Sequence, residues 1–108
     1  MADSVSFETC PTTVVEASRE RVWELLTNPA RLDEWVGVKV VQAPARHLAL
    51  GDHLIFGPAP AVRLSWTVLS VEPLRALELD IKVPLGIRNH EVIVVSHIDG
   101  SSCRVTFN

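Results

Sequence analysis

The chain has 108 residues, a length that accommodates a single domain with one hydrophobic core. Hydrophobic residues make up 47% of it, which indicates a large core, a lined cavity or a face that meets a partner. The net charge of −3, without a run of Lys or Arg, argues against nucleic acid as a partner. The first residues lack a secretory signal pattern and no segment is apolar enough to span a bilayer, so we expect a cytoplasmic protein.

The cysteines and histidines do not form a metal-binding pattern. Cys10 and Cys103 lack C-x-x-C spacing, and we expect both to be small buried hydrophobic residues. Three of the four histidines, His47, His53 and His97, lie at predicted loops or on the outer face of the predicted sheet, and no H-x-x-x-H spacing occurs. We therefore assign no metal and no cofactor.

The first predicted elements are a strand and a helix. The pattern predicts a strand over residues 7–17, with regular pairing only from Thr12, because Pro11 has no N–H for the ladder. Ser18 is a good N-cap and predicts a helix over residues 19–27. The apolar residues of this helix fall on one broad face: Val22, Trp23, Leu25 and Leu26.

A second short helix and a series of strands follow. Asn28-Pro29 interrupts the first helix and starts another, which we expect to end near Trp35. From Val36 onward the apolar residues alternate and β-branched residues dominate, which is typical of a sheet. Six strands are predicted, over residues 36–41, 54–56, 62–68, 77–83, 87–98 and 103–107. The short turns between them favour antiparallel pairing, since parallel strands need long crossovers.

The opening of the chain, a strand, a helix capped by Ser18, a break at Asn28-Pro29 and a segment that closes on Trp35, carries a family resemblance. It resembles the START-like or Bet v 1-like helix-grip superfamily (SRPBCC), which includes polyketide cyclases/dehydrases. The resemblance implies an α+β fold in which a curved antiparallel seven-stranded sheet and two short helices grip a C-terminal helix around a ligand cavity. Because the sequence stops after the seventh strand, we expect one START-like domain over residues 1–108, incomplete at the C-terminus.

The predicted sheet has an apolar face that two short helices do not obviously cover. Its alternating residues are Val36, Val38, Val40, Leu54, Phe56, Leu64, Trp66, Val68, Leu77, Leu79 and Ile81. Such a face favours a homodimer, a retained lipid or a partner helix. We therefore expect one of these three occupants.

His90 is the candidate polar group of the cavity. If Ile98 pairs with Cys103 across the last hairpin, then His90, Val92 and Val94 share the concave face with Cys103. There His90 would bind a ligand carbonyl or hydroxyl, or act as an acid or base. The alternative is a structural histidine at the sheet end, paired with Glu91 or a loop carbonyl.

Other charged residues have simpler interpretations. Arg63 and Arg88 lie near loops that the resemblance places at cavity openings, where they would meet a carboxylate or phosphate or simply add solubility. Glu78 and Asp80 alternate with apolar residues, so we predict a solvated pair on the outer face.

The leading functional hypothesis is the binding of a small hydrophobic ligand (a lipid, a polyketide or an aromatic compound) on the concave face. The predicted lining is Trp35, Val38, Phe56, Leu64, Trp66, Val68, Leu79, His90, Val92 and Val94. One alternative is an aromatase/cyclase-type enzyme that uses His90, although no second polar group is predicted on that face. The other is an interaction module that accepts a partner helix.

Overall fold

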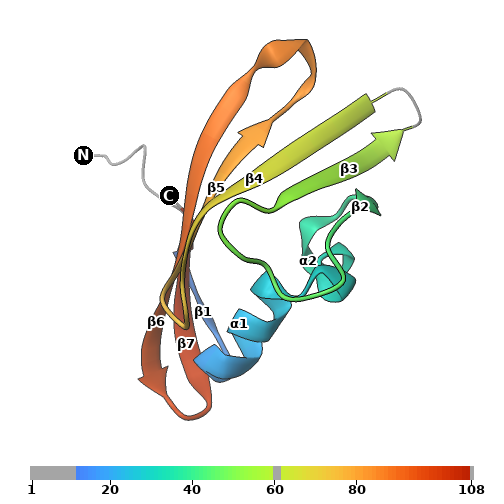
Figure 1. The fold of residues 1–108 in the computed structure, drawn as a ribbon. Helices are drawn as coiled ribbons and strands as arrows, with labels where there is room; N and C mark the ends of the chain where they lie inside the picture. Colours follow the sequence, from blue (N-terminus) through green and yellow to red (C-terminus); the bar gives the residue numbers. More distant parts are fainter. Residues whose placement is uncertain (1–11, 60–61, 108) are drawn as a thin grey trace.

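The structure is a computed structural model in which residues 12–59 and 62–107 are described, so Cys10 and residues 7–11 of the predicted first strand lie outside them. The strands are β1 (Thr12–Val15), β2 (Val40–Gln42), β3 (His53–Ala59), β4 (Val62–Glu72), β5 (Ala76–Lys82), β6 (Arg88–Asp99) and β7 (Ser102–Phe107). The helices are α1 (Arg19–Thr27) and α2 (Asp33–Val36), with 3-10 turns η1 (Pro29–Arg31) and η2 (Pro84–Gly86) (Figure 1).

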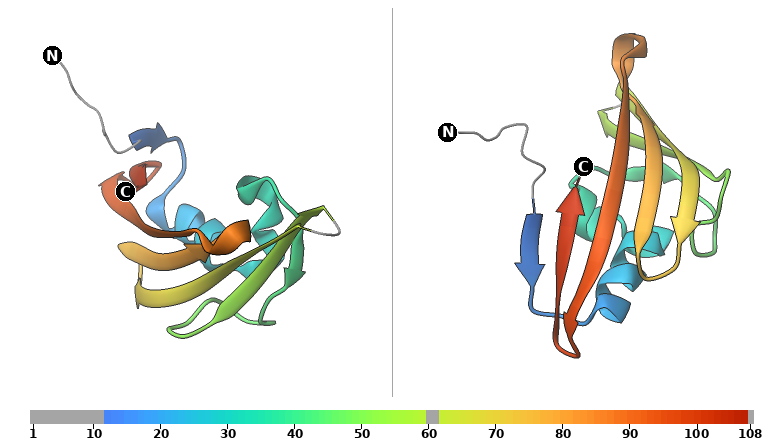
Figure 2. Two further views of the ribbon diagram at one scale, coloured as in Figure 1. Left: turned by 90° about the horizontal axis from the view of Figure 1, so that it is seen from above. Right: turned by 90° about the vertical axis from the view of Figure 1, so that its left-hand side faces the viewer.

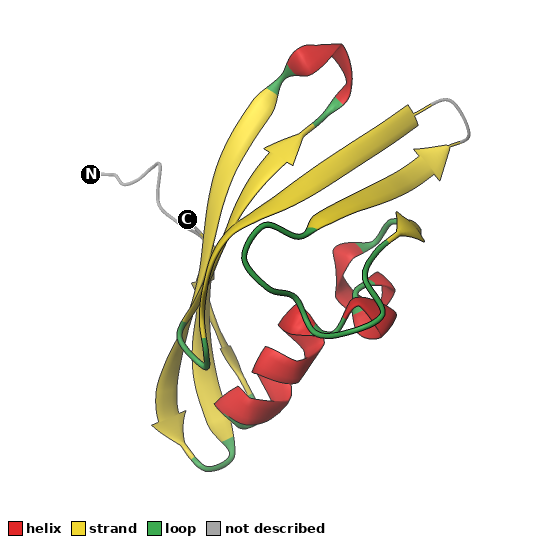
Figure 3. Cartoon of the chain, in the orientation of Figure 1, coloured by secondary structure: helices red, strands yellow, loops and turns green. Residues whose placement is uncertain are grey.

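The strands form one antiparallel sheet that confirms the predicted α+β, helix-grip fold class. Its order is β1-β7-β6-β5-β4-β3-β2, so β1 and β2 are the two edges. The sheet is strongly curved, and both α1 and α2 lie on its concave side (Figures 2 and 3). The opposite, convex face has no helix of the described chain across it.

The core lies between the concave face and the helices. Leu54 and Phe56 on β3 and Leu77 and Leu79 on β5 are fully buried, since every second residue of these strands points toward the helices. The other buried hydrophobic residues are Val22, Leu26, Leu32, Leu48, Trp66, Val68, Ile93, Val95, Cys103 and Val105. Cys103 is thus the small buried residue that its sequence context predicts.

The first helix begins and ends as predicted. The Ser18 side chain accepts a hydrogen bond from the Arg21 N–H at 3.3 Å, which satisfies one of the free donors of the first turn. At the other end, the Asn28 side chain accepts from the Ala30 N–H at 3.1 Å and so caps η1, where Pro29 occupies the first position.

The strand predicted from Val36 is wrong in its first half. Val36 is the last residue of α2, where its N–H donates to the Leu32 carbonyl at 2.9 Å. Gly37 then ends the helix with φ of 85°, a left-handed conformation that glycine adopts without steric cost. The strand β2 is therefore only three residues long and starts at Val40.

The register predicted for the last hairpin is also wrong by one residue. Cys103 lies opposite His97 and not opposite Ile98, and the register shifts between His97 and Asp99. The bulge adds one residue to β6, and a slip of one residue exchanges the two faces of a strand. Consequently Ile93 and Val95 face the core.

An ion pair organises the long connection between β2 and β3. Arg46 Nη1 and Nη2 donate to the two carboxylate oxygens of Asp52, each at 2.8 Å. The Ala49 N–H donates to the same carboxylate at 2.7 Å, and the Asp52 side chain is 11% exposed. These bonds, that from Arg46 foremost, lower the pKa of Asp52. They hold the connection while Leu48 enters the core.

We expect Asp52→Asn to destabilise the fold at neutral pH by about 1 kcal/mol, since the exposed Arg46 guanidinium and the Ala49 N–H lose an ionised acceptor. A lowered pKa in the folded state stabilises the protein above the ordinary carboxyl pKa of about 3.9, and this contribution is lost as the pH falls through the lowered value. Urea unfolding at a series of pH values from 7 down to about 2 measures how the free energy of unfolding changes with pH. Asp33→Asn, at an exposed position of α2, is the control. Equal acid sensitivity of wild type and Asp52→Asn would contradict the prediction.

Candidate functional site

Two adjoining hollows lie on the concave side of the sheet. The larger, about 320 Å³, lies between α2 and strands β4 to β7, and the smaller, about 170 Å³, between α1 and strands β1 and β7. Both are lined by Trp35 and Phe107, so we treat them as one site, the concave trough. Its lining is Thr13, Val15, Val22, Leu25, Leu26, Trp35, Val36, Trp66, Leu79, Ile81, Glu91, Ile93, Val105 and Phe107.

Trp35 is one of the two residues that line both hollows. Its indole Nε1 donates to the Leu25 carbonyl at 2.9 Å, which fixes α2 against α1. The Trp35 and Trp66 ring centroids are 6.0 Å apart at an interplanar angle of 47°, within the range of favourable aromatic pairs. A half-buried tryptophan whose polar atom is already bonded offers an apolar wall to a ligand.

Glu91 is the charged residue that sequence reasoning missed. It lies on β6 opposite Leu79 and two residues from Ile93, hence on the concave face. Among the described residues that line the trough, it alone carries a charged side chain. Asn89 Nδ2 donates to its Oε1 at 3.4 Å, a distance at the limit of a hydrogen bond. The sequence of β6 alone does not give the face of Glu91, because Val92 to Val95 are all apolar; the face follows from the register of the last hairpin.

Most of the predicted lining lies on the predicted side of the sheet. Trp35, Trp66 and Leu79 line the trough. Phe56 and Val68 are more than 98% buried and belong to the core. Val38 and Leu64, also named in the predicted lining, are partly buried against the same core.

His90, Val92 and Val94 are placed on the convex face, which corrects the prediction that they share the concave face with Cys103. The reason is the bulge near the end of β6, which reverses the face of every residue before it. His90 Nε2 lies 2.5 Å from a carboxylate oxygen of Glu78, its diagonal neighbour on β5, and both are on the outer face. His90 is therefore a surface cross-strand partner.

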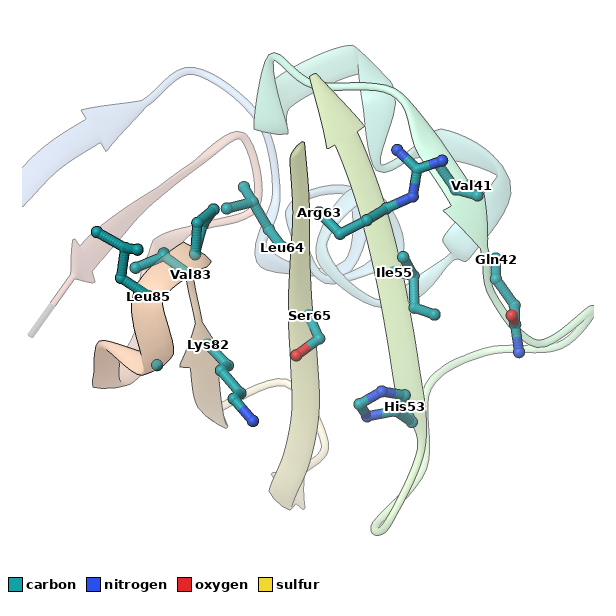
Figure 4. Close-up of a pocket in the computed structure, with 12 residues that line it drawn as sticks. Val41, Gln42, His53, Ile55, Arg63, Leu64, Ser65, Lys82, Val83 and Leu85 are labelled. Carbon is teal, nitrogen blue, oxygen red and sulfur yellow. The ribbon is translucent and has the colours of Figure 1, made fainter. Parts of the chain in front are cut away.

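A separate groove of about 550 Å³ crosses the convex face between β2 and η2 (Figure 4). Its lining includes His53, Ser65, Arg63 and Lys82. A Cβ atom at position 57 would lie 2.6 Å from Arg63 Nη1, so Gly57 leaves the room that the guanidinium occupies. The groove is open and mixed in polarity, and the sheet separates it from the trough.

The remaining predicted charged residues are also on the convex face. Arg88 forms an ion pair with Asp80, and this contact lowers the pKa of Asp80. Glu78 and Asp80 thus lie on the outer face as predicted. Arg88 takes no part in the lining of the trough.

The helices of the described residues are too short and too polar for any of them to span a membrane.

Residues 8–108 match the sequence profile of a family described as "Polyketide cyclase / dehydrase and lipid transport". The chain belongs to this family. The match spans nearly the whole sequence and therefore covers every helix and strand of the described fold. No curated protein matches the chain.

Solved structures with similar folds share little sequence with the chain. DynU16, a putative protein of the dynemicin biosynthetic locus, aligns with a TM-score of 0.70 at 17% identity and covers 92% of this chain. CalU16 from Micromonospora echinospora aligns with a TM-score of 0.69 at 18% identity over 89% of this chain. The chain spans only 36% and 53% of these two proteins.

Two further neighbours are described as an Aha1 dimer and as an HSP90 activator. The Aha1 dimer from Colwellia psychrerythraea aligns with a TM-score of 0.71 at 12% identity, over 92% of this chain and 72% of that protein. An HSP90 activator from Plasmodium falciparum aligns with a TM-score of 0.68 at 9% identity, over 93% and 71%. At these identities the likeness concerns the fold alone.

Proposed function

We propose that the protein binds a small hydrophobic ligand, such as a lipid, a polyketide or an aromatic compound, in the concave trough. The observation that carries the proposal is the lining itself, which is almost entirely aliphatic and aromatic and lies between helices and sheet. Trp35, held by its bond to Leu25, provides a rigid aromatic wall common to both hollows. The family description, which covers polyketide chemistry and lipid transport, supports the same class of ligand.

Binding is favoured over cyclase-type catalysis. Cyclisation needs a base together with a donor that stabilises the developing enolate. His90, the candidate acid or base of that hypothesis, is on the outer face, and the indole N–H of Trp35 is already bonded to Leu25. The Glu91 carboxylate could accept a proton but cannot donate to an oxyanion while ionised.

The trough also fits a partner helix or a second copy of the chain. The specific observation is its open apolar surface, together with a structural neighbour that is described as a dimer. A small ligand remains the first proposal, because the larger hollow, about 320 Å³, is of small-molecule size and the smaller one adjoins it. Sedimentation with and without a bound hydrophobic ligand separates the cases, since a dimer through the trough would dissociate when the ligand occupies it.

We expect Ile81→Lys to weaken the binding of Nile red, an uncharged hydrophobic dye, by about tenfold or more. Ile81 is half-buried in the trough, and a charge placed there is desolvated by an apolar ligand. Val92→Lys introduces the same charge on the convex face, opposite Glu78, and is expected to leave dye affinity unchanged. Fluorescence titration measures both. Equal affinities of two folded variants would refute the trough as the binding site.

A further inference from the structure

The concave trough has an uneven distribution of charge. Its described lining contains one carboxylate, that of Glu91, and no Lys, Arg or His. The cationic side chains nearest in sequence, Arg88 and Lys82, are on the convex strand positions, and Arg88 is engaged with Asp80. A ligand in the trough therefore meets a hydrogen-bond acceptor with a negative charge and no compensating cation.

Glu91 is partly exposed in the trough, where its carboxylate is accessible to a ligand. Asn89 Nδ2 donates to its Oε1 at 3.4 Å, which is long for a bond between an amide and a carboxylate. Glu91 lies on the same strand face as the buried Ile93 and opposite the fully buried Leu79. A strand position on this face would ordinarily carry an apolar residue, and the accessible carboxylate that stands there instead suits a ligand that supplies donors.

Trp66 and Glu91 lie in the same trough on strands that are not neighbours. Leu79 on β5 is opposite both Glu91 on β6 and Val68 on β4, and Trp66 lies two residues from Val68 on the same face. Two strand spacings therefore separate Glu91 from the strand of Trp66, roughly 10 Å of backbone distance. A ligand that reaches both must be elongated, with its polar group at one end.

We propose that the trough selects hydrophobic ligands that carry a cationic amine at one end, and that it rejects hydrophobic carboxylates. This inference rests on the proposed function, since it concerns the ligand of the same site. The ammonium end pairs with the Glu91 carboxylate, and the apolar body lies along the half-buried Ile81 toward Trp66. A ligand carboxylate would instead be desolvated beside a like charge.

The test uses three ligands with the same alkyl chain, namely decylamine, decanol and decanoate, with the two ionic ligands below their micelle concentrations and decanol below its solubility limit. Their competition against Nile red is measured on the wild type at neutral pH. We expect decylamine to bind about fivefold or more tightly than decanol, and decanoate to bind more weakly than decanol by a similar factor. In Glu91→Gln, the amine-to-alcohol affinity ratio is expected to fall to about one while decanol binding is retained.

Glu78→Gln is the matched control, because it removes the same charge from the convex face of the neighbouring strand. It is expected to keep the wild-type preference, which separates a local contact from attraction to the net charge of the protein. Equal binding of amine and carboxylate to the wild type, or an equal loss of preference in both variants, overturns the inference while decanol binding still supports the proposed function. Binding of none of the three ligands overturns both.

Discussion

Phe56→Ala is expected to destabilise the protein by about 3–5 kcal/mol, a large part of the stability of a domain this size. Phe56 is fully buried on β3, and its ring centroid lies 4.7 Å from that of Trp66 at an angle of 49°. Removal of the ring leaves a cavity under the curved part of the sheet, and Trp66 loses an aromatic partner. Chemical denaturation followed by circular dichroism measures the free energy of unfolding.

Ile55→Ala is the matched control for this prediction. Ile55 is the preceding residue of the same strand, half-buried on the convex face, where it lines the open groove. Its truncation is expected to cost about 1 kcal/mol, because no closed cavity results. If the two variants were destabilised equally, the assignment of the core to the concave side would be wrong.

The order and class of the elements could be predicted because local signals agree with the fold. Ser18, Asn28 and Pro29 mark helix ends by chemistry that acts within a few residues. The alternation of Leu77 and Leu79 with charged residues fixes their face without any knowledge of a partner strand. These signals are independent of long-range contacts, and the structure confirms the elements that they predict.

Both errors arise where the conformation of a single residue changes the course of the backbone. At Gly37 a left-handed residue ends α2, although valines on either side alternate as in a strand. At the end of β6 a bulge places His97 opposite Cys103. Bulges depend on the fit of two strands and a turn, so that the sequence of one strand does not reveal them.

The register error had the largest effect on the candidate site. It exchanged His90 for Glu91 as the polar group of the concave face, and so changed the expected chemistry from a donor or base to a carboxylate acceptor. The apolar part of the site was less sensitive. Trp35, Trp66 and Leu79 lie on elements whose faces were correctly predicted, and all three line the trough.

Trp35→Ala is expected to reduce the affinity for an uncharged hydrophobic dye by about tenfold or more, which corresponds to about 1.4 kcal/mol. Trp35 lines both hollows, and its loss removes a wall from each together with the bond that fixes α2 to the Leu25 carbonyl. Trp35→Phe keeps an aromatic wall without the donor, so we expect an intermediate affinity.

Trp23→Ala is the control for that measurement, because Trp23 is a half-buried tryptophan of α1 that packs against the core without lining the trough. Both variants lose aromatic area, so both are expected to be less stable, but only Trp35→Ala should lose dye affinity at a temperature where each is folded. Nile red titration together with circular dichroism provides the comparison. Wild-type affinity in a folded Trp35→Ala variant would place the dye elsewhere, and the groove on the convex face, with Arg63 and Lys82 in its lining, would then be the site to test.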